Sequence, residues 1–433
     1  MKLTMPLVDY SEGFSRTNDI FNRKPLSEKL ENIIRKSEDE SLVIALDDNW
    51  GSGKTTFLKM WEGEIIKNDE FKVVYFDAFQ NDFQSDPFVA LSAKLYALVE
   101  DNDLKERYLE ATKKVGGVVL KAAAKIGIGA LTLGLVKGSD IEDISESVSD
   151  AISNPIETYI EEKLKGAEQE EKTIEHFKTV LSEIAEDKKL IFIIDELDRA
   201  RPNYSLELLE RVKHIFNSKN IFFILATNKK QHLSIIKKTY GDIDVNTYLN
   251  KFIHFWFNLP TYNRQSQNNH VIDIYADKIQ AALDNENNEQ KMAFDCLKTL
   301  IKGNGCSLRD YERCYALQIL VLAAAPERLR WENQIGVAIL VFLKVKDEVN
   351  YRRVRDHEIK SRSELMGILK LPDTHKLKPI NPFFVAINTE YMSEEEFNNI
   401  PESESRTVFN DTFGDQLKVI TGSIEFIENL LVE

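Results

Sequence analysis

Residues 51–56 have the sequence Gly-Ser-Gly-Lys-Thr-Thr, and this pattern suits the binding of a phosphate chain. Glycine allows the backbone to curl so that several N–H groups point at one phosphate, and a helix that begins here adds a partial positive charge. Lys54 is expected to contact the β- and γ-phosphates of a nucleoside triphosphate, and the Thr55 hydroxyl to ligate Mg²⁺. The expected nucleotide-binding residues are Gly51, Ser52, Gly53, Lys54, Thr55 and Thr56.

This loop matches the end of the Walker A pattern, G-x-x-x-x-G-K-[ST], and departs from it at the first position, where Asp48 replaces glycine. Asp tolerates tight turns better than most residues, so the phosphate-facing part is expected to be intact. An apolar run, 42–46, precedes the loop, and helical spacing follows it over 57–66. This order of strand, loop and helix favours a nucleotide site over a glycine-rich turn that binds nothing.

Two adjacent acids, Asp195 and Glu196, follow the apolar run 190–194. A carboxylate at the end of such a strand can hold Mg²⁺ on the side opposite Thr55, and we expect this role for Asp195. Glu196 is suited to orient and polarise the attacking water. Asp198 is expected to support these acids or to cap a helix.

Two arginines, Arg199 and Arg201, come directly after these acids. One interpretation is that they supply positive charge to the site of a neighbouring subunit. The other is that Arg199 forms an ion pair with Asp198 or Glu196 of its own chain.

A third polar strand end, Thr227 and Asn228, follows the run 221–226. We expect the Asn228 side chain to lie beside the γ-phosphate and to help position the attacking water. Residues 227–229 also resemble the start of the guanine-recognition motif N-K-x-D, but Gln231 stands where that motif has aspartate. ATP is therefore favoured over GTP.

The elements that must position these residues follow from the spacing of apolar side chains. Four short runs rich in β-branched and aromatic residues, 42–46, 72–76, 190–194 and 221–226, are typical of buried parallel strands. Segments with helical spacing alternate with them, which predicts a doubly wound α/β fold with a parallel sheet. Ligands of such sheets bind beyond the carboxyl ends of the strands, where the polar residues described above occur.

The lengths between these runs predict five segments. They are 1–82, the first part of the nucleotide-binding core; 83–186, a helical insertion; 187–260, the rest of the core; 261–371, a helical lid; and 372–433, a C-terminal segment. Ser307 and Asp310 fit a capping box that begins a lid helix. Arg309 and Arg313 then share one face of that helix, where Arg309 either reaches the γ-phosphate or is solvated or paired with nearby acids.

The composition excludes several classes of function. The chain of 433 residues has 43% apolar and 29% charged residues and a net charge of -15, so bulk attraction to nucleic acid or to an anionic membrane is not expected. Its cysteines, Cys296, Cys306 and Cys314, are too few and too poorly spaced for a disulfide framework or a zinc site, which favours a cytoplasmic protein. The seven histidines form no H-E-x-x-H motif, which excludes zinc-peptidase chemistry.

Residues 115–136 carry only two charges, Lys121 and Lys125, among five glycines. The uncharged part, 126–136, is about half the ~20 residues that a membrane-spanning helix needs. We therefore expect a buried or amphipathic glycine-rich hairpin here. Contact with a membrane surface is the alternative, because both lysines can extend their charged ends to the interface. The charges within residues 1–25 argue against a secretory signal.

Several motifs, taken together, resemble the KAP family of P-loop NTPases. They are Trp50-Gly51-Ser52-Gly53-Lys54-Thr55, Phe76-Asp77-Ala78-Phe79-Gln80 and Ile194-Asp195-Glu196-Leu197-Asp198-Arg199, together with residues 21–26, 248–260 and 307–313. The resemblance covers residues 15–330, and its parts occur in the family's order. It implies an ASCE-type P-loop core with a helical lid and hydrolysis of ATP. It also implies transmembrane helices between the two Walker motifs in many members and, for bacterial members, exclusion of phages or plasmids together with effector proteins.

The leading prediction is an ATPase that uses Mg²⁺ and ATP to drive conformational change or assembly. The alternative is a nucleotide-gated scaffold that recruits an effector protein with little turnover. A kinase is the third interpretation, which needs a base such as Asp77 or Asp82 beside the γ-phosphate. A homo-oligomer is expected, since related NTPases often complete their sites with a neighbour's arginine. Two basic clusters, 351–362 and 229–238, are expected to be solvated helix faces, and nucleic-acid contact there is not favoured.

Overall fold

A five-stranded sheet forms the centre of the first body of the molecule. The computed structural model describes residues 8–37, 40–84, 86–131, 155–261, 270–282, 291–324, 329–371, 382–391, 393, 395 and 418–428. All strand pairs are parallel, in the order β2-β3-β4-β1-β5. The strands are β1 (Leu42–Asp47), β2 (Phe71–Asp77), β3 (Lys189–Asp195), β4 (Ile221–Thr227) and β5 (Phe255–Phe257).

The four strands predicted from the sequence are confirmed, each one or two residues longer than expected. The fifth, β5, was not predicted, because three residues are too few to show a period-two pattern. β3 and β4 are buried along almost their whole length, since helices cover both faces of the sheet.

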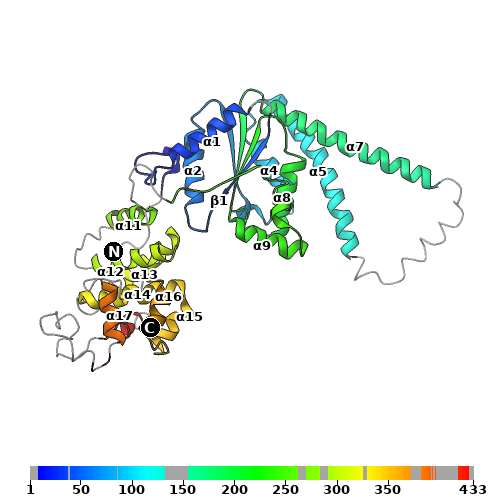
Figure 1. Cartoon of the computed structure of the whole chain (residues 1–433). Coiled ribbons are helices and arrows are strands. Elements are labelled where there is room, and N and C mark those ends of the chain that lie inside the picture. The colour runs from blue at the N-terminus through cyan, green and yellow to red at the C-terminus, as the bar shows by residue number, and fades with distance from the viewer. Residues whose placement is uncertain are drawn as a thin grey trace.

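Helices pack on both faces of this sheet, as the predicted α/β fold requires (Figure 1). One face is covered by η1, α1 and α2, and the other by α4, α8 and α9. The helices of the sheet body are η1 (Tyr10–Glu12), α1 (Lys24–Lys36), α2 (Lys54–Ile65), α3 (Ala78–Asn81), α4 (Pro87–Tyr96), α8 (Pro202–His214), α9 (Lys229–Tyr240) and α10 (Val245–Leu249).

Two long helices, α5 (Asn102–Leu131) and α7 (Pro155–Ile184), extend from the sheet, one leading away from it and the other returning (Figure 1). They contact each other and, with α4, occupy the predicted insertion, 83–186. Among the described helices, none is long and apolar enough to cross a membrane.

The expected glycine-rich hairpin is wrong for residues 115–131, because these residues continue α5 without a break. Gly116 and Gly117 are helical rather than turn-forming. Val115 and Val119 bury their side chains in the core beside the sheet, and this burial favours a straight helix over a turn. Residues 132–136 lie outside the described residues.

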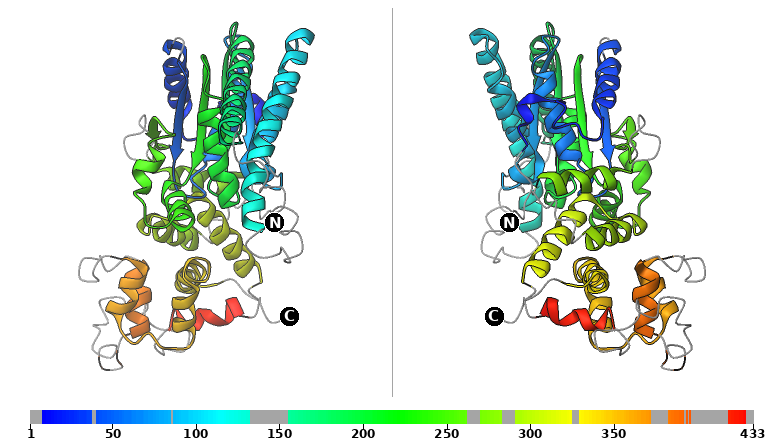
Figure 2. Two further views of the ribbon diagram at one scale, coloured as in Figure 1. Left: turned by 90° about the vertical axis from the view of Figure 1, so that its right-hand side faces the viewer. Right: turned by 90° about the vertical axis from the view of Figure 1, so that its left-hand side faces the viewer.

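A second body consists of helices around a core of its own, centred on α14, and Figure 2 shows it apart from the sheet. Its elements are α11 (Val271–Ala282), α12 (Lys291–Gly303), α13 (Leu308–Ala324), α14 (Trp331–Lys346), α15 (Glu348–Arg355), α16 (Arg362–Leu369), α17 (Pro382–Tyr391), η6 (Thr421–Ser423) and α19 (Ile424–Glu428). The C-terminal elements pack in the same core as the lid helices: Phe383, Val419 and Ile427 are buried there. The five predicted segments stay predictions.

The start of α13 joins the two bodies. The predicted capping box is present, since Asp310 N donates to Ser307 Oγ over 3.2 Å and Ser307 N donates to Asp310 Oδ2 over 2.9 Å. The cap places the first N–H group of the helix against the phosphate loop, where Leu308 N donates to Gly51 O over 3.1 Å. The helical body therefore touches the loop directly.

Candidate nucleotide-binding site

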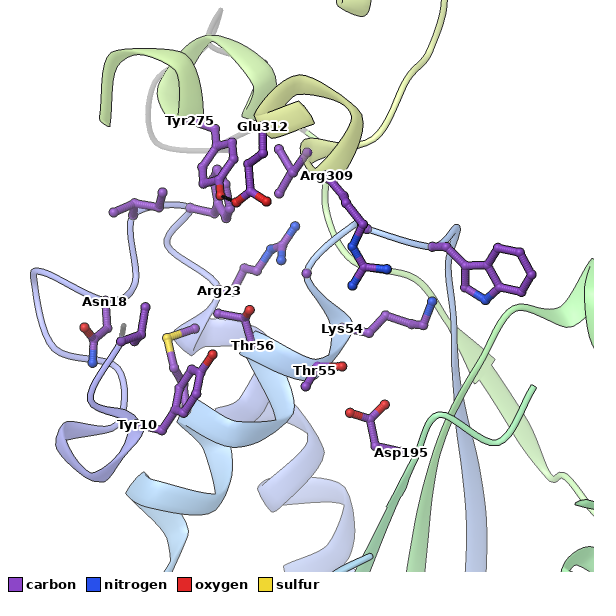
Figure 3. Close-up of a pocket in the computed structure, with 18 of the residues that line it drawn as sticks. Tyr10, Asn18, Arg23, Lys54, Thr55, Thr56, Asp195, Tyr275, Arg309 and Glu312 are labelled. Atoms are coloured by element: carbon purple, nitrogen blue, oxygen red, sulfur yellow. Dashed lines mark hydrogen bonds between the residues drawn. The ribbon is translucent and has the colours of Figure 1, made fainter. Parts of the chain in front are cut away.

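A cavity of about 570 Å³ lies where the sheet body, the N-terminal segment and the helical body meet (Figure 3). Its phosphate end is lined by residues of the loop and by Asp195, Glu196 and Asp198. The opposite end is lined by residues of the segment 8–23, by Tyr275 of α11 and by Glu312 of α13. The loop and the two predicted acids therefore lie together, as the sequence predicted.

The phosphate loop folds around the Lys54 side chain. Gly51 and Gly53 have φ of 78° and 91°, a left-handed backbone that glycine adopts without strain. The Lys54 ammonium donates to the carbonyls of Asp48 and Asn49 over 2.6 and 3.2 Å, and it lines the cavity together with Thr55 and Thr56. Burial lowers the pKa of Lys54, while the surrounding acids, Asp198 foremost, oppose the shift.

Asp195 is held in a fixed orientation at the end of β3. Its Oδ2 accepts from the Tyr75 hydroxyl over 2.7 Å, and its Oδ1 accepts from Glu196 N over 2.8 Å. Thr55 Oγ1 lies 3.5 Å from Glu196 Oε1, so the hydroxyl and the acids face one another. One hydroxyl and neighbouring carboxylates fit Mg²⁺, which takes oxygen ligands and keeps several waters. Within the described residues, no cluster of three or more His, Cys, Asp or Glu suits a metal held by protein ligands alone.

Glu196 has a left-handed backbone, with φ of 55°, and this turns its side chain toward the loop. Burial raises the pKa of Glu196, and the charge of Asp195 raises it further. Arg199 Nε lies 2.8 Å from Glu196 Oε2, so the ion-pair interpretation of this arginine holds within the chain. Arg201 is also engaged, since its Nη2 donates to Gln84 O over 3.2 Å and its N to Asp82 over 2.8 Å.

Arg309 is the arginine of the helical body that faces the cavity. It is exposed, its Cβ lies against Gly51, and its side chain is directed toward Lys54 in Figure 3. Two positively charged groups that face one another in this way favour the binding of an anion between them. Arg313 is exposed and does not line the cavity.

Asn228 is not brought to the cavity. Its side chain caps α9, where Oδ1 accepts from Gln231 N over 3.2 Å, and neither residue lines the cavity. The expected water-positioning role of Asn228 therefore stays a prediction without a contact to support it.

The segment 8–23 and α11 were missed as parts of the site. Tyr10, Asn18 and Arg23 of the segment line the cavity, as does Tyr275 of α11, whose hydroxyl donates to a carboxylate oxygen of Glu312 (Figure 3). Residues 21–26 entered the sequence analysis only as one of the motifs that resemble the KAP family. No spacing rule links them to α11, which is about 250 residues further along the chain.

Three arginines of the basic cluster 351–362 pair with neighbouring acids. Arg352 pairs with Glu348 at 3.2 Å, Arg355 with Asp356 at 2.8 Å, and Arg353 with Glu364. Paired guanidinium groups attract phosphate weakly, which agrees with the preference for solvated helix faces.

Residues 23–353 match the KAP family P-loop domain. The chain belongs to the KAP family. Its sheet has the ASCE order, in which one strand, β4, separates the phosphate-loop strand β1 from the acidic strand β3. No curated protein matches this member of the family.

Three solved structures are similar to this chain at low sequence identity. Cdc6p from Pyrobaculum aerophilum shares 12% identity over 99% of this chain and 90% of its own, with a TM-score of 0.41. The ORC2 protein of Aeropyrum pernix, in ADPNP and ADP complexes, shares 14% identity over 82% and 79%, with a TM-score of 0.35. ORC1 of the same organism, in complex with DNA, shares 12% identity over 98% and 85%, with a TM-score of 0.36.

Proposed function

We propose that this KAP-family NTPase binds ATP with Mg²⁺, hydrolyses it, and uses the loss of the γ-phosphate to move the helical body relative to the sheet. The observation that carries the proposal is the hydrogen bond from Leu308 N to Gly51 O, which attaches the start of α13 to the phosphate loop. A change in the phosphates that the loop binds would therefore act directly on α13.

The chemistry follows from the residues at the phosphate end. Lys54 and the loop N–H groups would hold the β- and γ-phosphates, and Thr55 and Asp195 would hold Mg²⁺, which would neutralise charge on the phosphates. Glu196, whose pKa burial raises, accepts a proton from the attacking water. Arg309 contacts the γ-phosphate and loses this contact once the phosphate leaves.

The experiment compares two variants with the parent. Lys54→Ala is expected to lose ATP binding, measured by calorimetry. Glu196→Gln is expected to bind ATP as the parent does but to release phosphate at least about 100-fold more slowly. Binding by Lys54→Ala that equals the parent's, or unchanged phosphate release by Glu196→Gln, would contradict the proposal.

A nucleotide-gated scaffold with little turnover is the second candidate, and the ion pair between Glu196 and Arg199 favours it. A carboxylate that is already paired is a weaker acceptor for the proton of water. This candidate predicts ATP-dependent assembly or effector binding without phosphate release. Mass measurement with and without ATP and Mg²⁺, on the sample used for the phosphate assay, separates the two. A role in phage or plasmid exclusion with an effector is the biological setting that the family suggests.

A further inference from the structure

Arg23 is a buried cation with an incomplete set of partners at the cavity. Its side chain is only 4% exposed, yet it lines the cavity between the phosphate loop and Tyr275 (Figure 3). One bond is formed by the guanidinium group, from Nη2 to Ser52 O over 3.2 Å, while its buried Nε has no partner. Among the described residues, no carboxylate forms an ion pair with it, and its face covers the Phe21 ring at 4.7 Å.

An acid of its own segment, Asp19, is already engaged elsewhere. Asp19 accepts from the backbone N–H groups of Arg23 and Lys24 over 2.7 and 2.9 Å. Burial lowers the pKa of Arg23 to about 10, although Asp48 and Asp19 oppose this shift. Removing a guanidinium from water without an ionic partner is costly, so this position is suited to an anion that enters with a ligand.

The position of Arg23 indicates which phosphate of a nucleotide it would contact. Lys54, Thr55 and Asp195 mark the end that holds Mg²⁺ and the γ-phosphate. Arg23 lies on the other side of the loop, where its Nη1 is 3.0 Å from the place that a Cβ on Gly53 would occupy. We propose that Arg23 donates to the oxygens of the phosphate nearest the ribose, the α-phosphate. This inference rests on the proposed binding of a nucleotide at the loop.

A contact at the α-phosphate is present with ATP and with ADP alike. The segment 8–23 then holds either nucleotide, whereas Arg309 on α13 contacts the γ-phosphate alone. The two arginines therefore have different roles. Arg23 holds the nucleotide before and after hydrolysis, and Arg309 distinguishes ATP from ADP.

The test measures the dissociation constants of Mg-ATP and Mg-ADP for Arg23→Gln, Arg23→Lys and the parent. Arg23→Gln is expected to weaken both nucleotides by the same factor, about 10-fold to 100-fold for a lost charged hydrogen bond. Arg23→Lys keeps the charge but not the planar fork, so it is expected to lose less, again equally for both. Arg16→Gln, an exposed arginine of the same segment, is the control and should change neither constant.

A spectroscopic readout separates a contact from a structural role. In ³¹P NMR of bound ADP, Arg23→Lys should shift the α-phosphate resonance and leave the β resonance in place. Unchanged affinity for both nucleotides, loss for ATP alone, or an unshifted α resonance would overturn the assignment while leaving the proposed ATPase intact. If Arg23→Gln does not fold, Arg23→Lys and the NMR readout still decide the question. A parent protein that binds neither nucleotide would instead refute the proposed function.

Discussion

The two ends of the cavity are built in different ways. The phosphate end consists of one loop and one strand end, whose positions the parallel pairing of β1, β4 and β3 determines. The opposite end, which we call the base end because we expect the nucleotide base there, is assembled from the segment 8–23, α11 and α13. It includes a contact between bodies, from Lys278 Nζ to Thr17 O over 2.8 Å. We therefore expect the phosphate end to supply most of the affinity and the base end to depend on how the helical body docks.

Gly51→Ala is expected to have the largest effect, because this glycine lies where the phosphate end meets α13. A Cβ there would lie 2.6 Å from Arg309 Cβ and 2.7 Å from Ser307 Oγ, on a backbone with φ of 78°. The start of α13 must move away, and ATP affinity should fall at least about 100-fold, which corresponds to ~3 kcal/mol. Calorimetric titration with Mg-ATP measures the loss.

Gly241→Ala is the matched control for this substitution. Gly241 has nearly the same φ, 79°, but no atom lies within 4 Å of a Cβ built on it. The variant should therefore have the backbone strain without the clash. Its free energy of unfolding should fall by ~1 kcal/mol, and its ATP affinity should be unchanged. Equal losses of affinity in both variants would show that strain, rather than the contact with α13, is responsible.

Tyr75→Phe is expected to act at the phosphate end alone. The Tyr75 hydroxyl orients Asp195, and partners that orient a metal ligand typically contribute at least about tenfold to metal affinity. The Mg²⁺ concentration that half-saturates ATP binding should rise about tenfold, while ADP binding without Mg²⁺ stays constant. Tyr204→Phe removes a buried hydroxyl with no partner and should leave this concentration as in the parent. An unchanged Mg²⁺ requirement in Tyr75→Phe would argue against a role for that hydroxyl.

The difference between the two ends of the cavity also explains which parts of the site the sequence could predict. Strands β1 to β4, the loop from Gly51 to Thr56 and the acids after β3 are short-range patterns, and parallel pairing brings them together at one sheet edge. Arg309 could be placed on α13 because a local capping box begins that helix. Arg23 and Tyr275 could not be assigned to the site, since only the docking of the helical body brings them to one cavity.

The hairpin expected at 115–131 failed for a related reason. Glycine lowers helix propensity by only about 1 kcal/mol, and the burial of Val115 and Val119 offsets this. The role of Asn228 rested on its position at a strand end and stays a prediction, since its carbonyl oxygen accepts from the first turn of α9. Propensity is a weak guide where a tertiary contact competes.

Arg199→Gln is expected to change the pH dependence of hydrolysis. Burial and Asp195 raise the pKa of Glu196, and Arg199 lowers it. Since the deprotonated carboxylate accepts the proton, turnover should rise with pH through the pKa of Glu196, and losing Arg199 should move this rise to higher pH. The displacement should be modest, because the Arg199 side chain is 33% exposed and solvent screens its charge. A pH–rate profile of kcat tests this. A uniform loss of kcat without displacement would instead indicate that Arg199 serves a neighbouring subunit.

Lys278→Met should have the smallest effect, because it removes one exposed contact between the bodies while keeping the length of the side chain. Loss of the bond to Thr17 O should weaken ATP and ADP equally, by about threefold, which is typical of a single hydrogen bond near the surface. Lys298→Met removes a partly exposed ion pair with Asp295 on the same body and should change neither affinity. A loss in Lys278→Met as large as that of Gly51→Ala would mean that docking of the helical body, and not the phosphate loop, supplies most of the binding energy.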